Sequence, residues 1–356
     1  MNARMRRLPH AVSGDHALVL IGIGKVGSAL MGLLDALRPT RLRLVGVANS
    51  RGQWTNFREF SGLDLGTLPS KLCGPRDDAA LLAALDASGA LHRVLVDASA
   101  SEAVARRHAH WLGRGYHVVT ANKCLLGGTL LDWRNVESAR EEGCRYGDSA
   151  TVGAGLPVLS SLRRLRACGD RLLGIEGVFS GTLSWLFNHF DGNRPFSALL
   201  REARSLGFTE PDPRIDLSGE DVVRKLLILA RTSGNPLDRR DVQVDDLVPE
   251  ELRNLPTDDF LASAGVMDEA IAARHARAHS RGCVLRHLAR IDNDGCARVG
   301  LVDVPAAHPA ARLQGSDNLF VLHTQRYGDR PLVIQGAGAG PELTAQALLA
   351  DVMAVA

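Results

Sequence analysis

The sequence predicts an α/β fold with a parallel sheet in its first part and an α+β fold in its second part. Up to about residue 150, short apolar runs rich in β-branched residues alternate with helical patterns, which is typical of a doubly wound parallel sheet. Beyond that point, strands and long helices are grouped without regular alternation. The length of 356 residues suits about two domains.

The composition is that of an ordinary globular protein. Hydrophobic residues make up 45% of the chain and the formal net charge is +2, so neither nucleic acid nor a membrane is an expected partner. No apolar run approaches the roughly 18 residues of a membrane span. The six cysteines form no C-x-x-C pair, which favours reduced thiols in the cytoplasm over a zinc site or disulfides. The basic residues 1–16 lack an apolar core, so we expect a loose tail and no signal peptide.

The first expected strand, residues 17–21, leads into the turn GIGKVG at residues 22–27 and then into a helical pattern. A strand, G-x-G-x-x-G and a helix together form the context of the dinucleotide-binding (Rossmann) fingerprint. Its first glycine allows a tight turn, its second admits the pyrophosphate, and its third lets the helix pack closely on the strand. The helix N-terminus receives the phosphates. The expected cofactor contacts are Gly22, Gly24, Lys25, Val26 and Gly27; a glycine-rich turn without a ligand is the alternative.

The end of the second expected strand, residues 42–47, bears on the choice of cofactor. NAD-binding proteins usually place an acid there for the ribose diol. The sequence has no acid at this point but has Asn49 and Arg51, which we expect to contact the cofactor. This favours the 2′-phosphate of NADP(H), with NAD(H) as the second choice. The alternative is that Arg51 is a solvated loop charge.

Polar side chains follow the next two expected strands, residues 93–97 and 117–120. Because cofactor sites in parallel sheets lie at the carboxyl ends of strands, we expect contacts from Ser99, Ser101, Thr120, Asn122 and Lys123. The alternatives are that the two serines cap the following helix and that the lysine is a surface charge. Two histidines of that helix, His108 and His110, are two residues apart and do not share a face, so we interpret them as surface residues.

The stretch at residues 207–225 gathers several charges. Two prolines stiffen a loop that carries Glu210, Asp212 and Asp216, and a helix follows. Its expected N-cap is Ser218, with Asp221 completing a capping box. Asp221 and Lys225 are four residues apart and share one helix face. The stretch is therefore either a cradle for a small zwitterion or a capped helix with an ion pair worth about 0.3–0.5 kcal/mol.

The remaining expected elements belong to the second part. A glycine-rich turn at residues 148–157 precedes a helix, and a strand at residues 172–179 leads to Ser180, Gly181 and Thr182, which open another helix. This helix N-terminus suits a substrate carboxylate, and simple capping is the alternative. We also expect a helical segment at 258–280, a hairpin at 283–304, and strands at 318–325 and 331–335. A glycine-rich loop precedes the last helix; we expect it to return to the cofactor, with Gly338 as a contact, and a tight connection is the alternative.

At this point the motifs match a known family. The chain resembles homoserine dehydrogenase over nearly its whole length, through GIGKVG (22–27), VVTANK (118–123), TVGAGLP (151–157), GTLS (181–184) and EPDPR (210–214) followed by RK (224–225). The runs VANS (47–50) and GAG (338–340) are most similar to the dehydrogenase half of bifunctional aspartokinase–homoserine dehydrogenases. No kinase half accompanies them, so we expect a stand-alone catalytic unit.

The resemblance implies a division into domains and a reaction. It implies a dinucleotide-binding domain over residues 15–150, to which residues 331–356 return, and a substrate-binding and dimerisation domain over residues 151–330. The family's reaction, in threonine and methionine biosynthesis, is reversible reduction of L-aspartate 4-semialdehyde to L-homoserine with NAD(P)H. By position, the family's catalytic lysine and proton donor is Lys225, and Lys123 lies between cofactor and substrate.

The resemblance also implies substrate contacts, a cation and an oligomer. Glu210 and Asp221 match the family's substrate carboxylates. Apart from the resemblance, the helix N-terminus at Gly181 and Thr182 suits the substrate carboxylate. Many family members bind a monovalent cation through a glutamate, but the corresponding residue here is Ser149. Na⁺ would depend on backbone carbonyls, those of Val152, Ala154 and Leu156.

A homodimer or homotetramer is expected. Two other functions stay open: another amino-acid or semialdehyde oxidoreductase of the same two-domain plan, and a non-catalytic NADPH-binding regulator. The first would not turn over homoserine with either nicotinamide. The second would bind cofactor without acting on any semialdehyde.

Overall fold

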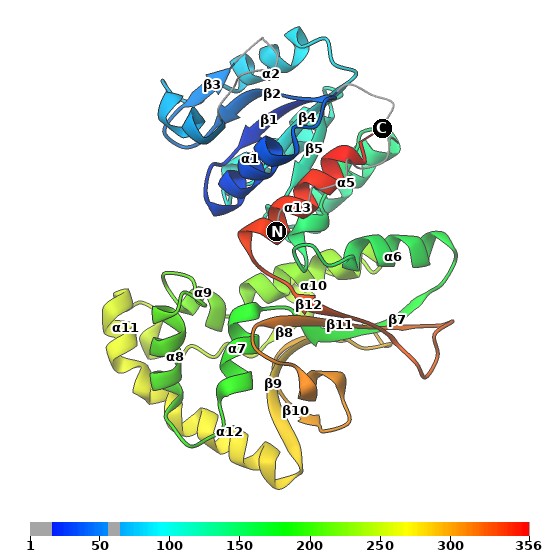
Figure 1. The fold of residues 1–356 in the computed structure, drawn as a ribbon. Coiled ribbons are helices and arrows are strands. Elements are labelled where there is room, and N and C mark those ends of the chain that lie inside the picture. Colours follow the sequence, from blue (N-terminus) through cyan, green and yellow to red (C-terminus); the bar gives the residue numbers. More distant parts are fainter. Residues whose placement is uncertain (1–15, 56–64, 356) are drawn as a thin grey trace, which may run out of the picture.

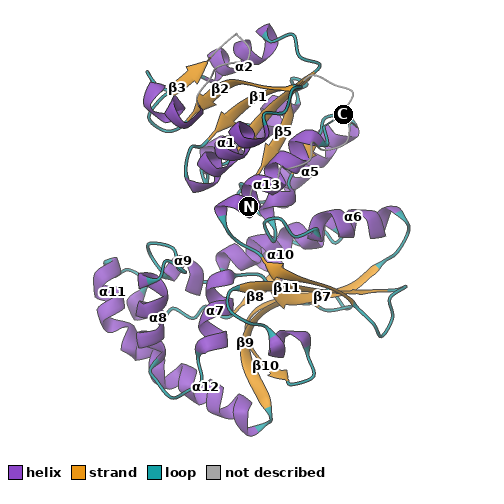
Figure 2. Cartoon of the chain, viewed as in Figure 1, coloured by secondary structure: helices purple, strands orange, loops and turns teal. Residues whose placement is uncertain are grey.

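The computed structural model describes residues 16–55 and 65–355, and its strands form two six-stranded sheets (Figures 1 and 2). The expected N-terminal tail lies outside the described residues up to residue 15. No helix in the described part of the chain is long and apolar enough to cross a membrane.

The first sheet has the strand order β3-β2-β1-β4-β5-β6. Neighbouring strands are parallel, except that the edge strand β3 runs antiparallel to β2. The strands read as apolar runs because both faces of the sheet are covered, and every residue of β1 is buried. The predicted doubly wound sheet is therefore confirmed. Its strands are β1 (His16–Ile21), β2 (Leu42–Ala48), β3 (Gln53–Thr55), β4 (His92–Asp97), β5 (His117–Thr120) and β6 (Tyr146–Gly147).

Helices pack on both faces of this sheet. The helices α1 (Lys25–Leu37) and α13 (Pro341–Met353) share one apolar cluster with one face, while α2 (Asp78–Ala87), α4 (His108–Leu112) and α5 (Leu130–Glu141) share a cluster with the other. The single helix expected after Ser101 is divided into α3 (Glu102–Ala105) and α4. The 3₁₀ segment η1 (Leu65–Lys71) completes this part.

The second sheet has the order β12-β11-β7-β9-β10-β8 and is antiparallel except for the pair β10 and β8. The predicted hairpin is confirmed as the antiparallel pair β9 and β10. The strands are β7 (Leu172–Val178), β8 (Val242–Val244), β9 (Cys283–Ile291), β10 (Ala297–Pro305), β11 (Asp317–Thr324) and β12 (Leu332–Ala337).

The helices of the second part include one that lies between the two sheets in Figure 1, α10. Residues 226–230 of α10 are all fully buried, as the apolar run predicts, and each such Leu or Ile side chain contributes about 1.5–3 kcal/mol. The helices are α6 (Val158–Ala167), α7 (Gly181–His189), α8 (Phe196–Ser205), α9 (Arg214–Leu217), α10 (Glu220–Thr232), α11 (Thr257–Ser263) and α12 (Asp268–Ser280). Short 3₁₀ segments are η2 (Ser149–Thr151), η3 (Arg239–Asp241), η4 (Glu250–Leu252), η5 (Ala264–Met267) and η6 (Pro309–Arg312).

The C-terminal helix lies beside the first helix of the chain (Figure 1). Leu348 and Val352 of α13 share an apolar cluster with Leu30 and Leu34 of α1. The strand β12 that precedes α13 is paired with β11 within the second sheet. The domain limits at residues 150 and 331 stay predictions.

Candidate active site

The glycine-rich turn between β1 and α1 forms a cradle that fits a dinucleotide. Gly22 has φ +98°, and a Cβ at this position would lie 2.8 Å from the backbone of Ala98 and Ser99. A Cβ at Gly27 would lie 1.9 Å from the carbonyl oxygen of Gly22, so the helix packs against the turn as expected. At Gly24, by contrast, a Cβ would meet nothing within 4 Å. The turn is therefore closed on the protein side and open in front of the helix N-terminus.

The end of β2 carries the two residues expected near the ribose. The side-chain oxygen of Asn49 accepts hydrogen bonds from the backbone N–H groups of Arg51 (2.7 Å) and Gly52 (3.1 Å), which closes a tight turn. The exposed Arg51 guanidinium forms no ion pair within the described residues. It is thus available to an anion, whereas the Asn49 side chain shapes the turn.

The hydroxyl groups expected at the ends of β4 and β5 are engaged within the protein. Ser99 donates to Asp97 Oδ1 through its N–H (2.9 Å) and its hydroxyl (2.6 Å). Ser101 caps α3 by accepting from Val104 N–H, which is the alternative foreseen for it. Thr120 donates to the carbonyl oxygen of Asp97 at 3.2 Å. These side chains hold the loops in place, and their contacts with a cofactor stay predictions.

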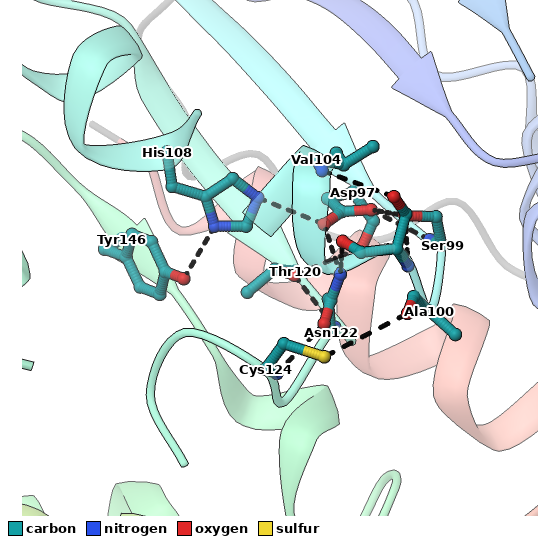
Figure 3. Close-up of polar contacts among 10 residues, drawn as sticks. Asp97, Ser99, Ala100, Val104, His108, Thr120, Asn122, Cys124 and Tyr146 are labelled. Atoms are coloured by element: carbon teal, nitrogen blue, oxygen red, sulfur yellow. Dashed lines mark hydrogen bonds and ion pairs between the residues drawn. The ribbon is translucent and has the colours of Figure 1, made fainter. Parts of the chain in front are cut away.

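The interpretation of His108 as a surface residue is wrong. Its side chain is fully buried and bonded to Asp97 and Tyr146 (Figure 3). The helix is interrupted between α3, which ends at Ala105, and α4, which begins at His108. The interpretation of His108 as a surface residue assumed a single continuous helix. His110 is exposed, as expected.

Three charged side chains meet at α10: Lys123 from the loop after β5, and Asp221 and Lys225 from the helix itself. Lys225 Nζ lies 2.8 Å from Asp221 Oδ2, and Lys123 Nζ lies 3.4 Å from Asp221 Oδ1. Lys225 also donates to the carbonyl oxygen of Phe179 at 2.7 Å. An ammonium group has three donors, so Lys225 keeps one for a further acceptor. A Cβ at Gly127 would lie 2.7 Å from Arg224 Cβ, and this close approach brings the loop of Lys123 against α10.

The two lysines fix the ionisation of Asp221. Burial alone would raise the pKa of this carboxyl, but the charges of Lys225 and Lys123 and their hydrogen bonds outweigh it and hold the pKa below its usual range. The carboxylate therefore stays ionised at any pH at which the protein works. It links the sheet-end loop of Lys123 to the helix of Lys225.

The predicted capping box at the start of α10 is wrong. The N-cap is Gly219, with φ +73°, and no side chain caps the helix. Ser218 instead ends the short helix α9, which the sequence pattern did not reveal. Because Asp221 is not needed as a cap, both of its carboxylate oxygens are free to bind lysines.

Asp216 is the site residue that sequence reasoning did not single out. Its carboxylate accepts from Thr182 Oγ1 and from the N–H of Glu210, both at 2.8 Å. Burial raises the pKa of Asp216 to about 6, and the nearby charges of Glu210 and Asp221 add to the rise. The carboxyl groups of Glu210 and Asp221 are therefore near that of Asp216. The signal in the sequence was the acidic loop, but spacing did not distinguish Asp216 from Asp212.

Asp212 has a structural role in the same loop. Hydrogen bonds from Arg214 hold its pKa below the ordinary value, against the opposing effect of burial. Arg214 continues to the carbonyl oxygens of Leu252, Arg253 and Leu255 at 2.6–3.1 Å. The pair thus anchors the acidic loop to the segment after η4.

The start of α7 lies at the same site. Ser180 caps the helix by accepting from Leu183 N–H, and the hydroxyl of Thr182 is engaged with Phe208 O and Asp216. Gly181 lies close to the loop at residues 336–340 that precedes α13, since its Cβ would lie 3.8 Å from that of Ala339. Backbone N–H groups, and not hydroxyls, are therefore what this turn offers a carboxylate. In this loop, a Cβ at Gly338 would collide with the Asn318 side chain at 2.2 Å.

The residues at the expected cation site do not fit a tightly held ion. Ser149 donates through its N–H and hydroxyl to the two oxygens of Asp351, at 2.8 Å each, and burial raises the pKa of Asp351 to about 6. The carbonyl oxygen of Leu156 accepts from Val158 N–H at 2.8 Å. The described residues contain no group of three His, Cys, Asp or Glu side chains able to hold a metal. Na⁺ at the carbonyls of Val152, Ala154 and Leu156 stays a prediction.

Comparison with known proteins agrees with this geometry. Residues 22–146 match the family described as homoserine dehydrogenase, NAD binding domain, and residues 157–353 match the family described as homoserine dehydrogenase. Among solved structures, a Candida auris protein of unknown function has a TM-score of 0.88 at 32% identity, covering 96% of this chain and 98% of that one. A hyperthermophilic archaeal homoserine dehydrogenase in complex with NADPH has the same fold, with a TM-score of 0.71 at 21% identity over 94% and 96% of the two chains.

Two curated relatives define the family. The chain is 39% identical to the chloroplastic bifunctional aspartokinase/homoserine dehydrogenase 2 of Zea mays, over 96% of this chain and 38% of that protein. It therefore spans about two-fifths of the length of such bifunctional relatives. It is 37% identical to the homoserine dehydrogenase of Emericella nidulans, over 95% of this chain and 97% of that protein. The resemblance found in the motifs is thereby confirmed, and the chain belongs to the homoserine dehydrogenase family.

Proposed function

We propose that this chain catalyses the reversible reduction of L-aspartate 4-semialdehyde to L-homoserine with a nicotinamide cofactor. The observation that carries the proposal is the meeting of Lys123, Asp221 and Lys225 at the carboxyl ends of the first sheet. A bound nicotinamide would supply the hydride to the aldehyde carbon. The aldehyde oxygen then needs a proton and a positive field, and both can come from the protein.

In this proposal Lys225 is the proton donor. Its Nζ has one free N–H direction beyond those used by Asp221 and Phe179 O, and it is 12% exposed, enough to be reached by a small substrate. As the carbonyl becomes an alkoxide, Lys225 transfers a proton to that oxygen, and in the reverse direction it takes the proton back. Lys123 adds positive charge on the other side of Asp221. Asp221 keeps the two ammonium groups in place.

The acidic loop suits the substrate's ammonium group. Glu210 is exposed and adjacent to Asp216, and the two are near Asp221. Since Asp221 already pairs with two lysines, we assign most of the ammonium binding to Glu210 and Asp216. The substrate carboxylate would bind the N–H groups at the start of α7, Gly181 and Thr182.

We propose NADP(H) as the preferred cofactor, because the end of β2 carries exposed Arg51 and no acid. We further propose a homodimer or homotetramer formed through the second sheet, where Val333 is 42% exposed and Val284 and Val302 are only partly buried. Six free cysteines are consistent with a reducing, cytoplasmic location.

The proposed function is tested by mixing the purified protein with L-homoserine and either NADP⁺ or NAD⁺ and following absorbance at 340 nm. The proposal predicts reduced cofactor formation, faster with NADP⁺. Absence of turnover with both cofactors, in a protein that still binds NADPH, would contradict the proposal, and activity on another semialdehyde would then separate the other oxidoreductase from the regulator. Sedimentation analysis of the same sample tests the oligomer, and a monomer would contradict that part.

A further inference from the structure

Asp97, the last residue of β4, is a fully buried carboxylate held by four hydrogen-bond donors (Figure 3). Its Oδ1 accepts from the N–H and the hydroxyl of Ser99, at 2.9 and 2.6 Å. Its Oδ2 accepts from Asn122 Nδ2 at 3.0 Å and faces His108 Nε2 at 3.1 Å. Both carboxylate oxygens are therefore used, and each points to a different loop.

Asn122 extends this contact into a link between the two loops. Its Nδ2 also donates to the carbonyl oxygen of Ser101 at 2.9 Å, and its Oδ1 accepts from Cys124 N–H at 3.0 Å. The amide is thus fixed in one orientation, because both of its N–H donors and its oxygen are hydrogen-bonded. Since Lys123 directly follows Asn122, the path of the backbone at Asn122 sets where Lys123 starts towards Asp221.

His108 and Tyr146 extend the hydrogen bonds of Asp97 towards β6. Tyr146 is buried, and this burial raises its pKa well above the ordinary value, so its hydroxyl keeps its proton. Its hydroxyl lies 2.9 Å from His108 Nδ1, and His108 Nε2 donates to the carboxylate of Asp97, which can only accept. The three side chains form one chain of hydrogen bonds from β6 to the end of β4.

The location of this buried charge indicates a role beyond filling the core. Burying a carboxylate is costly, and the same strand fills its other buried positions with Val94, Leu95 and Val96. The charge stands at the end of the strand, where it contacts both loops at the carboxyl edge. It also lies behind the dinucleotide cradle, because the adjacent Ala98 and Ser99 touch Gly22.

We propose that Asp97 is a positioning residue for hydride transfer. It fixes the loop at Ser99 against the loop at Asn122 and so holds the backbone at the carboxyl edge of the first sheet and Lys123 in position relative to Asp221. The inference rests on the proposed function for the identity of the reaction. Displacing a reacting group by about 1 Å can cost about a hundredfold in rate. Changing a residue that sets this spacing should therefore lower kcat strongly.

The test variant is Asp97→Asn, which keeps the shape but replaces one acceptor by a donor. If the remaining oxygen stays with Ser99, the new amide faces the donor of Asn122, and Asn122 cannot turn round without losing its bonds to Ser101 and Cys124. We expect kcat to fall by about tenfold to a hundredfold and the dissociation constant for NADPH to rise by about tenfold. The KM for homoserine should stay within about threefold, because the proposed ammonium site lies in the acidic loop.

Two controls separate positioning from general loss of stability. Asp170 is also a buried carboxyl that joins two segments, through Thr324 Oγ1 at 2.8 Å and Arg326 N–H at 3.0 Å, but it lies at the opposite end of β7 from Phe179. Asp170→Asn should lower the melting temperature and leave kcat within about twofold of the wild type. Tyr146→Phe, which removes only the hydroxyl behind His108, should have a much smaller effect on kcat than Asp97→Asn.

Asn122→Ala carries the test if Asp97→Asn does not fold, since it cuts the link between the loops and leaves Asp97 with three donors. It should reproduce the fall in kcat. The inference is overturned if the test variant that folds, Asp97→Asn or Asn122→Ala, keeps kcat within about threefold of the wild type. It is also overturned if that variant loses no more kcat than Asp170→Asn. If the wild type does not oxidise homoserine, the proposed function fails by itself, and NADPH binding decides: an unchanged dissociation constant in the variant then overturns the positioning role.

Discussion

The carboxylate of Asp221 lies 2.8 Å from Lys225 Nζ, one helical turn further along α10. The same carboxylate reaches Lys123 on a loop of the first sheet, and it is ionised because both cations hold its pKa down against the effect of burial. One side chain thus joins the proposed proton donor to the cofactor side of the site.

Asp221→Asn tests this link. Removing the charge leaves two ammonium groups close together without a counter-charge, so they should move apart and kcat should fall by about tenfold or more. The neighbouring Glu220 provides the control, because among the described residues its carboxylate pairs only with Arg239, at the surface. Steady-state kinetics should show Glu220→Gln close to the wild type. Equal losses in the two variants would mean that Asp221 matters only for the helix.

Asp216→Asn should stabilise the protein while weakening substrate binding. The folded-state pKa of about 6 exceeds the ordinary 3.8, so the unfolded state releases this proton first. The resulting destabilisation develops as pH rises from about 4 to 6, and above pH 6 it reaches about 3 kcal/mol. An amide in this place can still accept from Glu210 N–H and donate to Thr182 Oγ1. We expect a higher melting temperature at pH 8, a gain that shrinks towards pH 4, and a raised KM for homoserine.

A pH-independent difference in melting temperature would show that Asp216 does not carry the shifted proton. An unchanged KM would remove Asp216 from the ammonium site. The two outcomes are separate, because one concerns the free protein and the other its complex with substrate.

Arg51→Ala should affect NADP(H) more than NAD(H). The 2′-phosphate is present only in NADP(H), and losing a charge-assisted contact of this kind costs about 1.5–3 kcal/mol, or about tenfold or more in affinity. Arg298→Ala, at an exposed position on β10, is the control. Fluorescence titration with NADPH and NADH measures both affinities, and an equal loss for the two would contradict the assignment.

Gly24→Ala should separate cofactor binding from folding. A methyl group at Gly24 meets no protein atom within 4 Å and the backbone φ is −81°, so the fold should tolerate it. The methyl would instead occupy space in front of the helix N-terminus, where the pyrophosphate is proposed to lie. We expect an unchanged melting temperature and weaker NADPH binding.

Gly32→Ala is the matched control on the same helix, since its Cβ would also meet nothing within 4 Å. It should stabilise the protein by about 0.5–1 kcal/mol and leave NADPH binding unchanged. If both variants bind NADPH like the wild type, the cradle does not hold the cofactor.

The strands and helices could be predicted because their apolar periodicity is local. The expected strand at residues 117–120 coincides with β5, and the expected hairpin at residues 283–304 coincides with β9 and β10. The spacing of Asp221 and Lys225 likewise predicted their shared face, which the ion pair confirms. In each case the information lies within a few residues of the chain.

Apart from the capping box predicted at Ser218, the errors concern information that is not local. The burial of His108 depends on a break in the helix at residues 106–107 and on Tyr146, 38 positions away in the chain. The choice of Asp216 over Asp212 depends on Thr182, which comes from another helix. The contact of Ser149 with Asp351 joins residues 202 positions apart. Spacing in the sequence carries no signal for such pairs.

The most direct test of the account is kcat for homoserine oxidation in Lys225→Ala, measured at saturating NADP⁺. General acid–base catalysis contributes about 10²- to 10⁴-fold, so the account predicts a loss of that size with NADPH binding retained. Lys71→Ala, at an exposed lysine on η1, should equal the wild type. A Lys225→Ala variant with kcat within a few-fold of the wild type would contradict the proton-donor role and, with it, the central claim.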